Sequence, residues 1–560
     1  MPAAPLRYVA ESGWAWRVDK TKKVANRNDQ LRNLNGGVYD VLVIGAGING
    51  AASAAALAAA GVQVALVDAA DFAGCTSSES SNLIWGGIKY LENLEVGFVR
   101  QLCQGRNELM RSYPGSIRET RFLAAVHKKS RFPTWVLWLG TWVYWCLSNG
   151  FTGTPRYLFR QGVKSREPII KTGDLAGGLI YSDARLIDGD ARFVLNLVKQ
   201  AIKSGTTAIN YLEVIELERE RSGGWVVTLA DRVTGGNSSL RARYIVNAGG
   251  PFADQLNRKA QFDTTTHHVY SKGIHLIVDP ITDSGRVLVF YADDGRMFFA
   301  IPMSGKTCIG TTDTAVESPL VEVTDEDRQF VLDNINRQLD LTMPLTRGDI
   351  LAERCGVRLL IATGARDHTR DDWLNRSRQF VAEASSNLGI VCIFGGKLTD
   401  CLKVGEEVCR AVSRFGIGCD PGKWYGEPGQ ELLEEFKDKL GEVDAALGKG
   451  NDLPWDKLWR KYGADALEIL ESILRDKSRS KIVLQTEKIC RAELEMIRNQ
   501  EYVESLDDFL RRRTWLAQTY RLEEIADMPG IFEACSILFD GLAAQKYEDY
   551  FHTSIAQRAS

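Results

Sequence analysis

The chain has 560 residues, of which 44% are hydrophobic and 25% are charged, and its formal net charge is −3 at pH 7. A chain of this length buries a large core and is expected to form two to four domains, which excludes a small disulfide-stapled fold. Because basic residues do not outnumber acidic ones, we expect no nucleic-acid partner. The eleven cysteines include no CxxC pair and no Cys/His cluster, so we expect reduced thiols, no disulfide framework and no metal site.

Residues 1 to 37 form an N-terminal extension with a basic run that acidic residues interrupt. The pattern fits either a poor organelle-targeting segment or an ordered extension, since a transit peptide is usually richer in Arg and Ser and poorer in acids. The fate of this segment stays open on sequence alone.

Residues 38 to 68 have the pattern of a strand, a glycine-rich turn, a helix and a second strand. In the turn, Gly45 permits the tight bend, Gly47 leaves room for a pyrophosphate, and Gly50 lets the helix lie close to the sheet. Asp68 ends the second strand, where its carboxylate can accept hydrogen bonds from the adenosine ribose. A carboxylate at this position also argues against NADP as the cofactor. We therefore predict a dinucleotide site; the alternative is a parallel α/β turn without a ligand.

A loop dense in small hydroxyl residues follows, and residues 74 to 92 read GCTSSESSNLIWGGIKYLE. Placed after the first βαβ unit, this segment resembles the FAD-dependent glycerol-3-phosphate dehydrogenases and the related glycerophosphate oxidases, whose segment reads approximately TSS-x-SS-x-LIHGG-x-RYL. The chain departs from that pattern at Trp85, where the family has histidine, and at Lys89, where it has arginine. On spacing alone, the loop is also compatible with a turn whose serines cap the next helix.

Residues 132 to 147 are apolar and rich in aromatic side chains, and basic residues precede them. The run is too short and too aromatic for a helix that crosses a bilayer. It suits a helix in the lipid headgroup region, where indoles prefer to lie; the alternative is a buried helix at a domain or subunit interface. The resemblance implies monotopic membrane attachment for respiratory members of the family, and this favours the membrane surface.

The rest of the chain continues with alternating helix and strand patterns before it becomes helical. Near residue 395 a buried strand ends in FGGKLT, which matches the signature of the family almost letter for letter. Beyond about residue 420, Lys, Glu, Leu and Trp recur at helical spacing, and DFLRRRT resembles the C-terminal helical domain of the family. The three arginines of that run are otherwise an ordinary solvated or interface charge cluster. Between residues 190 and 350 we predict helices over 191 to 202 and 324 to 341. We predict strands over 210 to 217, 224 to 230, 243 to 249 and 272 to 279, and a set of antiparallel strands over 286 to 314.

These elements predict an α/β fold class, α+β overall: a two-dinucleotide-binding-fold flavoprotein with a Rossmann-like FAD domain, an antiparallel-sheet substrate domain and a C-terminal helical domain. The expected boundaries are 1–37 for the N-terminal extension, 38–118, 170–255 and 350–415 for the FAD-binding domain, 119–169 and 256–349 for the substrate domain, and 416–560 for the helical domain.

The resemblance implies FAD as the cofactor. No motif argues for covalent attachment, and the question stays open. Trp85 removes a polar group from beside the flavin, so it is expected to change flavin reactivity or the way the flavin is held. The residues expected to bind FAD are Gly45, Gly47, Ile48, Asn49, Gly50, Asp68, Thr76, Ser77, Ser80, Ser81, Leu83, Trp85, Gly86, Gly87, Val214, Ala248, Gly249, Gly396, Lys397, Leu398 and Thr399.

Oxidation of a secondary alcohol beside a phosphate ester needs cations that hold the dianion. By the resemblance, Arg358, Arg378 and Lys89 supply them, although the local alignment of Arg378 with Arg376 can slip. Lysine keeps the charge of arginine but loses its bidentate fork, so Lys89 predicts weaker holding of the phosphate.

The same reaction needs a base for the hydroxyl proton and stabilisation of the charge that builds up on reduction. His275 is the expected general base or orienting residue, although a lone histidine in a strand is more often structural. Tyr90 is expected to donate to the substrate oxygen, and Lys397, with the dipole of the following helix, is expected to face the flavin pyrimidine edge.

The implied reaction is oxidation of sn-glycerol 3-phosphate to dihydroxyacetone phosphate by hydride transfer to FAD N5, with the electrons passed to a quinone. Two alternatives stay open: a soluble glycerophosphate oxidase that produces hydrogen peroxide, and a catalytically lapsed FAD-binding subunit of a larger assembly. A nicotinamide-dependent dehydrogenase is disfavoured. The expected location is the periphery of the mitochondrial inner membrane in a eukaryote, or of the cytoplasmic membrane otherwise, and a homodimer stays open.

Overall fold

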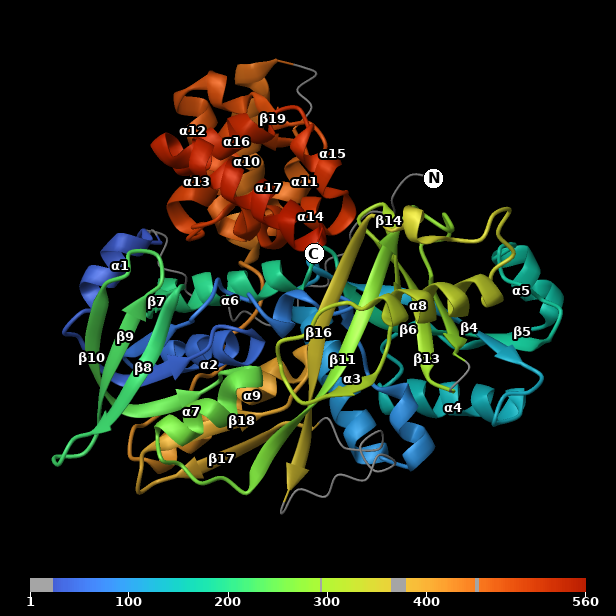
Figure 1. The fold of residues 1–560 in the computed structure, drawn as a ribbon, viewed down its shortest axis with the longest axis horizontal. Helices are drawn as coiled ribbons and strands as arrows, with labels where there is room; N and C mark the ends of the chain where they lie inside the picture. The colour runs from blue at the N-terminus through green and yellow to red at the C-terminus, as the bar shows by residue number, and fades with distance from the viewer. Residues whose placement is uncertain (1–23, 293–294, 364–378, 449–452, 560) are drawn as a thin grey trace.

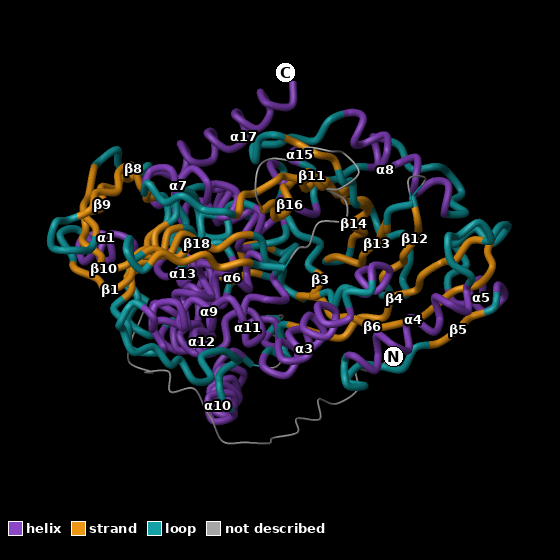
Figure 2. Tube along the Cα trace, turned by 90° about the horizontal axis from the view of Figure 1, so that it is seen from below, coloured by secondary structure: helices purple, strands orange, loops and turns teal. Residues whose placement is uncertain are grey.

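Two large β-sheets lie side by side, and a helical C-terminal unit covers one end of both (Figures 1 and 2). The computed structural model describes residues 24–292, 295–363, 379–448 and 453–559. The predicted three-part architecture is confirmed.

The first sheet is built around β1 (Val38–Ile44), which pairs in parallel with β10 (Asn237–Asn247) on one side and β2 (Val64–Val67) on the other. Helix α2 (Ile48–Ala59) packs against α6 (Asp190–Lys203) and α9. Covered strands of this kind are apolar throughout, as β2 is. The remaining elements around this sheet are α1 (Arg27–Leu34), β7 (Thr207–Ile209), β8 (Leu212–Arg219), β9 (Trp225–Asp231), α7 (Ala253–Lys259), β17 (Val381–Ser385), β18 (Ile390–Phe394) and α9 (Cys401–Arg414).

The second sheet is mainly antiparallel, and its longest pairing joins β11 (Thr266–Val278) to β16 (Ala352–Thr363). On the other side of the sheet, β4 (Ile117–His127) pairs with β6 (Leu175–Leu186). The other elements of this part are β3 (Leu83–Ile84), η2 (Ile88–Asn93), α3 (Val96–Ser112), α4 (Thr134–Leu147), β5 (Arg156–Leu158), α5 (Arg160–Arg166), β12 (Val287–Tyr291), β13 (Met297–Met303), β14 (Lys306–Gly310), β15 (Thr314–Val316) and α8 (Asp325–Gln338).

The pairing of the strands differs from the domain boundaries that we expected at residues 170 and 350. Strands β6 and β16 belong to the second sheet, although both fall in segments assigned to the FAD-binding domain. A buried strand has the same apolar pattern whichever sheet it joins, so only its pairing partner decides its membership. Residues 324 to 341 follow the prediction more closely, because Thr324 and Asp327 form a capping box at the start of α8.

The C-terminal unit has its own hydrophobic core and lies above α6 in Figure 1. One two-stranded sheet, β19 (Ile482–Leu484) with β20 (Ile489–Cys490), interrupts its helices. Its helices are α10 (Gln430–Leu447), α11 (Trp455–Tyr462), α12 (Ala466–Arg475), α13 (Arg491–Gln500), the π-helical η9 (Asp508–Arg513), α14 (Leu516–Thr519), α15 (Leu522–Ala526), α16 (Ile531–Phe539) and α17 (Ala543–Ala559).

The aromatic segment forms α4, which lies at the periphery of the second sheet (Figures 1 and 2). Several of its large apolar side chains face outward, and Trp135 and Leu139 are 66% and 54% exposed. The helix therefore presents an apolar face that the described chain does not bury.

Within the described residues, no helix combines the length and the apolar character needed to cross a membrane.

Candidate active site

The glycine turn after β1 leaves no room for side chains at two of its three glycines. A Cβ on Gly45 would lie 2.5 Å from the carbonyl oxygen of Ala248, and one on Gly50 would lie 1.7 Å from the carbonyl oxygen of Gly45. Helix α2 starts directly after Gly47 and has no acidic residue in its first turn. The positive end of its dipole therefore remains available to an anion.

Asp68 is fixed at the carboxyl end of β2, beside this turn. Its Oδ2 accepts a hydrogen bond from the backbone N–H of Ala46 at 2.6 Å, and its Oδ1 accepts one from Ala70 at 2.9 Å. Burial raises the pKa of Asp68 to about 6. Each carboxylate oxygen keeps a second lone pair, so Asp68 can still accept a hydrogen bond from a ligand hydroxyl.

The hydroxyl-rich loop connects three separate parts of the chain. The Oγ of Ser77 accepts a hydrogen bond from the backbone N–H of Ile48 at 3.0 Å, which places the loop at the start of α2. The Oγ1 of Thr76 donates to the carbonyl of Val357 on β16 at 3.2 Å. These hydroxyls bond to other segments, as in a loop that joins the two sheets, and do not cap the next helix.

The FGGKLT turn meets both earlier motifs. The side-chain amide of Asn49 donates to the carbonyl of Gly395 at 3.1 Å, and the Oγ1 of Thr399 donates to the carbonyl of Trp85 at 3.3 Å. Three motifs that lie far apart in the sequence thus surround one location between the two sheets.

Lys397 is held among aromatic rings at this location. Its Nζ lies 4.2 Å from the centre of the Tyr90 ring, 5.3 Å from that of Trp85 and 5.4 Å from that of Phe98. The face of an aromatic ring attracts a cation, and this attraction is stronger where water is excluded. The three rings therefore fix the position of the Lys397 ammonium group.

His275 and Arg358 come from the paired strands β11 and β16. His275 is 5% exposed, and burial, together with the charges of Arg354 and Arg358, lowers its pKa to about 3. Its imidazole is therefore neutral at pH 7, and the same surroundings make it a weaker base than an exposed histidine; the negative charge of a bound phosphate would oppose the effect of the arginines. The Nη1 of Arg358 donates to the carbonyl of Thr312 at 2.8 Å and lies 3.4 Å from the Oδ1 of Asp313, and its Nη2 donates to the Oγ1 of Thr311, so the guanidinium is held at both terminal nitrogens.

Arg354 is a functional candidate that the sequence reasoning missed. It is fully buried, pairs in register with His275, and donates to the carbonyl of Ser78 in the hydroxyl-rich loop. Arg354 and Arg358 are four residues apart on one strand, so both side chains lie on the same face of the sheet. That even spacing was the signal available in the sequence.

Other predicted site residues lie less centrally. Lys89 is exposed on η2, one residue before Tyr90. Val214 is buried in β8, and its carbonyl accepts a hydrogen bond from the Nζ of Lys259 at 2.8 Å. Arg376 and Arg378 lie outside the described residues.

The geometry of this site agrees with the protein family that the chain matches. The family described as FAD dependent oxidoreductase matches residues 40–402, which is more than half of the chain. This chain belongs to the FAD-dependent oxidoreductases. The cofactor and the fold predicted from the sequence are therefore confirmed.

Relatives of this FAD-dependent oxidoreductase also agree with the resemblance drawn from the sequence. An aerobic glycerol-3-phosphate dehydrogenase of Bacillus subtilis is 33% identical over 69% of each chain, and one of Staphylococcus aureus is 29% identical over 86% of this chain and 88% of its own. The solved glycerol-3-phosphate dehydrogenase of Bacillus halodurans, complexed with FAD, matches with a TM-score of 0.70 at 25% identity and covers 94% of this chain and 96% of its own. An L-alpha-glycerophosphate oxidase of Mycoplasma pneumoniae shares the fold, with a TM-score of 0.53 at 17% identity over 70% of this chain and 98% of its own.

The residues of this FAD-dependent oxidoreductase fit the cofactor. The absence of a side chain at Gly47 keeps the start of α2 open, because a Cβ there would come within 3.1 Å of the Oγ of Ser77. Gly45 and Gly50 have the close backbone packing that the pyrophosphate turn requires. The α2 N-terminus fits the phosphates and Asp68 fits the ribose, and all of the contacts with FAD stay predictions.

A buried polar cluster of Asp183, Tyr144 and Arg106 contacts the Gly86–Gly87 turn of the oxidoreductase. The Oδ1 of Asp183 accepts from the backbone N–H of Gly86 at 3.0 Å, from the hydroxyl of Tyr144 at 2.6 Å and from the Nη1 of Arg106 at 2.6 Å. Arg106 is fully buried. The cluster therefore fixes the backbone at Gly86, between Trp85 and Tyr90, through the hydrogen bond to Asp183.

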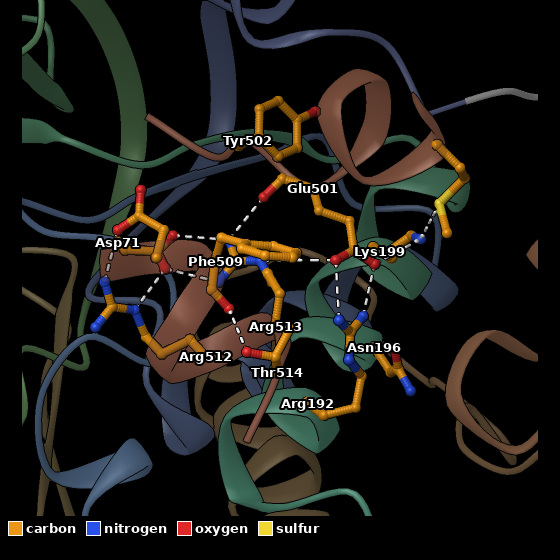
Figure 3. Close-up of polar contacts among 12 residues, drawn as sticks. Asp71, Arg192, Asn196, Lys199, Glu501, Tyr502, Phe509, Arg512, Arg513 and Thr514 are labelled. Atoms are coloured by element: carbon orange, nitrogen blue, oxygen red, sulfur yellow. Dashed lines mark hydrogen bonds and ion pairs between the residues drawn. The ribbon is translucent and has the colours of Figure 1, made fainter. Parts of the chain in front are cut away.

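A second polar network ties the C-terminal unit of the oxidoreductase to its first sheet (Figure 3). Arg513 donates to both carboxylate oxygens of Asp71 at 2.7 and 2.9 Å, and Arg512 donates to the Oδ2 of the same residue at 2.7 Å. Burial alone would raise the pKa of Asp71, but the charges of Arg513 and Arg512 outweigh it and lower that pKa. On α6, Arg192 pairs with both oxygens of Glu501 at 2.6 and 2.9 Å.

Arg511 extends this network to the hydroxyl-rich loop. Its Nε and Nη2 donate to the two carboxylate oxygens of Glu79, each at 2.9 Å. The arginines of DFLRRRT therefore form an interface cluster, and Arg511 connects the helical unit to the loop that contains Thr76 and Ser77.

Proposed function

We propose that this chain oxidises sn-glycerol 3-phosphate to dihydroxyacetone phosphate. The observation that carries the proposal is the joint placement of a buried, neutral imidazole, His275, and the guanidinium of Arg358 on paired strands beside the FAD motifs. The names of relatives that match most of the chain support the same substrate.

The protein groups have distinct tasks in this reaction. Arg358, with Lys89, binds the phosphate of the substrate, and a guanidinium fork suits two phosphate oxygens. His275 accepts the proton of the hydroxyl group that is oxidised. Lys397 places positive charge where negative charge accumulates, while Tyr90 orients the substrate oxygen. Bound FAD supplies a hydride acceptor.

Anaerobic titration with glycerol 3-phosphate tests the substrate. The purified, FAD-loaded protein is expected to lose its flavin absorbance as the ester is added, whereas glycerol, which lacks the phosphate, should leave the absorbance unchanged. A protein that binds FAD but keeps its absorbance at saturating ester would contradict the proposed reaction and would instead support a catalytically lapsed subunit.

We propose a quinone as the electron acceptor. The exposed apolar face of α4 supports a location where lipid-soluble acceptors are found, because indole side chains prefer the lipid headgroup region. With glycerol 3-phosphate and air as the only oxidant, we expect little hydrogen peroxide, and a soluble quinone analogue should restore turnover. Stoichiometric peroxide would favour the oxidase instead.

We further propose that α4 attaches the protein to a membrane surface: the mitochondrial inner membrane in a eukaryote, or the cytoplasmic membrane otherwise. Trp135 and Leu139 are the most exposed large apolar residues of the helix. The double exchange Trp135→Ser with Leu139→Ser is expected to abolish sedimentation with phosphatidylcholine vesicles and leave flavin bleaching unchanged. If the exchange converts a dimer to a monomer and has no effect on vesicle binding, α4 is a subunit interface.

A further inference from the structure

A concave surface on the second sheet shares no lining residue with the candidate active site. It encloses about 500 Å³, and four of its eight lining residues are arginines. Arg121 lies on β4, Arg156 on β5, Arg166 at the end of α5, and Arg286 directly before β12. Elements distant in the sequence thus contribute one cation each, and we call this surface the arginine pocket.

One wall of the arginine pocket is the loop between α4 and β5, and hydrogen bonds hold it in place. The indole N–H of Trp145 donates to the carbonyl of Thr152 at 2.7 Å, and the backbone N–H of Gly153 donates to Glu119 at 2.8 Å. Arg121 donates to the carbonyl of Thr154 at 2.8 Å. The pocket is therefore a built feature of the fold.

The charge in the arginine pocket is only partly compensated. Glu119 is the one carboxylate among the eight lining residues, and its Oε1 lies 3.8 Å from the Nη1 of Arg121. Glu167 accepts from Arg286 at 2.9 Å, but it is fully buried behind the surface. The four guanidinium groups are thus neutralised by only two carboxylates, Glu119 and Glu167, and the pocket keeps a net positive charge.

Burial and the neighbouring cations both act on Arg121. Partial burial, reinforced by the nearby charges of Arg156 and Arg286, lowers the pKa of Arg121 in spite of Glu119. Like charges gathered in a concave, partly desolvated surface repel one another, and an anion placed between them relieves that repulsion. The arrangement is therefore suited to a ligand with more than one negative charge.

We propose that the arginine pocket binds a phosphoryl group that carries two or more negative charges, on a soluble phosphorylated molecule or on a lipid headgroup. Guanidinium forks match pairs of phosphate oxygens, and four arginines line a volume large enough for a diphosphate. Ile180 is the one large hydrophobic residue among the eight lining residues.

A matched control surface exists in the C-terminal unit. There, Arg491 and Arg498 line a hollow of about 300 Å³ together with the carboxylates of Glu495, Glu533 and Asp540. Exchange of these two arginines removes the same charge as exchange of two arginines from the arginine pocket. Because acidic residues dominate that hollow, we expect it to have no affinity for phosphate.

The test is calorimetric titration of the FAD-loaded full chain with inorganic pyrophosphate at low ionic strength. Arg156 and Arg166 are both exposed, so Arg156→Ala with Arg166→Ala should leave the fold intact. We expect this variant to bind pyrophosphate at least tenfold more weakly than the wild type, while Arg491→Ala with Arg498→Ala binds like the wild type. Flavin bleaching by glycerol 3-phosphate should be equal in all three proteins, which separates this pocket from the active site.

Vesicles distinguish the source of the phosphoryl group. Phosphatidylcholine vesicles with added phosphatidic acid present a phosphomonoester at the lipid surface. If the arginine pocket variant loses binding to these vesicles but not to pure phosphatidylcholine, the ligand is a headgroup; if only its pyrophosphate affinity falls, the ligand is soluble. Equal affinity of the pocket variant and the wild type for both probes would overturn the proposal, as would an equal loss in the control variant.

Discussion

The Nζ of Lys397 lies 4.2 Å from the centre of the Tyr90 ring, so the FGGKLT turn and the hydroxyl-rich segment meet through a cation and a ring face. The interaction lets Tyr90 set the position of the positive charge, which is predicted to face the flavin. It also assigns the tyrosine ring a role that is separate from its hydroxyl group.

Exchange of the ring tests this role. Tyr90→Leu is expected to slow anaerobic flavin reduction roughly 2- to 30-fold, because a partly buried cation–π contact contributes about 0.5 to 2 kcal/mol. Tyr90→Phe keeps the ring and should lose only what the hydroxyl donates to the substrate. Stopped-flow absorbance at saturating glycerol 3-phosphate measures both rates. Equal rates in the two variants would show that the ring does not position Lys397.

Arg358 is expected to bind the phosphate. Arg358→Ala should raise KM for glycerol 3-phosphate by about 10- to 150-fold, since a hydrogen bond to a charged group contributes about 1.5 to 3 kcal/mol. Arg358→Lys should recover only part of this, because lysine lacks the fork. Arg241→Ala, which removes an exposed arginine from the first sheet, is the control. An unchanged KM in Arg358→Ala would remove this residue from the substrate site.

The pair of Arg511 and Glu79 is expected to shape the loop at the cofactor. Arg511→Ala and Glu79→Gln should each weaken FAD binding, measured by fluorescence as the flavin is released. The double variant should bind FAD about as weakly as either single variant, because both exchanges break the same contact. Fully additive losses would mean that the two residues act separately.

Arg513 is expected to be a large contributor to stability. It is 2% exposed and bonds to Asp71, so Arg513→Ala leaves a buried carboxylate without one of its partners and should lower the free energy of unfolding by about 3 to 5 kcal/mol. Arg479→Ala removes an ion pair of a side chain that is 38% exposed and should cost about 0 to 1 kcal/mol. Denaturant titration compares the two. Similar losses would show that the buried network is not a principal link between the units.

Two buried histidines make stability depend on pH. Burial lowers the pKa of His275 to about 3 and that of His268 to about 4, both below the ordinary value of 6.5. Below pH 6.5 the unfolded chain therefore binds more protons than the folded chain, and stability falls as the pH falls. Between pH 6.5 and 5, each histidine should contribute a loss of up to about 2 kcal/mol.

His275→Asn should remove about half of the slope that these two residues cause, and His268→Asn a similar share. Denaturant midpoints measured at several pH values give the slopes. If His275→Asn keeps the full slope of the wild type, the imidazole of His275 is not held neutral by burial.

The sequence by itself determined the cofactor and the fold class. Local patterns carry both, since the Gly45 turn, the hydroxyl-rich loop and FGGKLT each depend on backbone conformations that few residue types can adopt. The family matched over residues 40–402 confirms what those motifs predicted. The individual contacts of the site residues with ligands remain predictions.

Only the tertiary structure decided which sheet β6 and β16 join, that Arg354 lies beside His275, that the arginines of DFLRRRT hold Asp71 and Glu79, and that four scattered arginines form one pocket. Each of these depends on contacts between residues far apart in the chain. A strand or a charged side chain has the same local sequence pattern whatever it faces, so its partner is set by packing of the whole molecule.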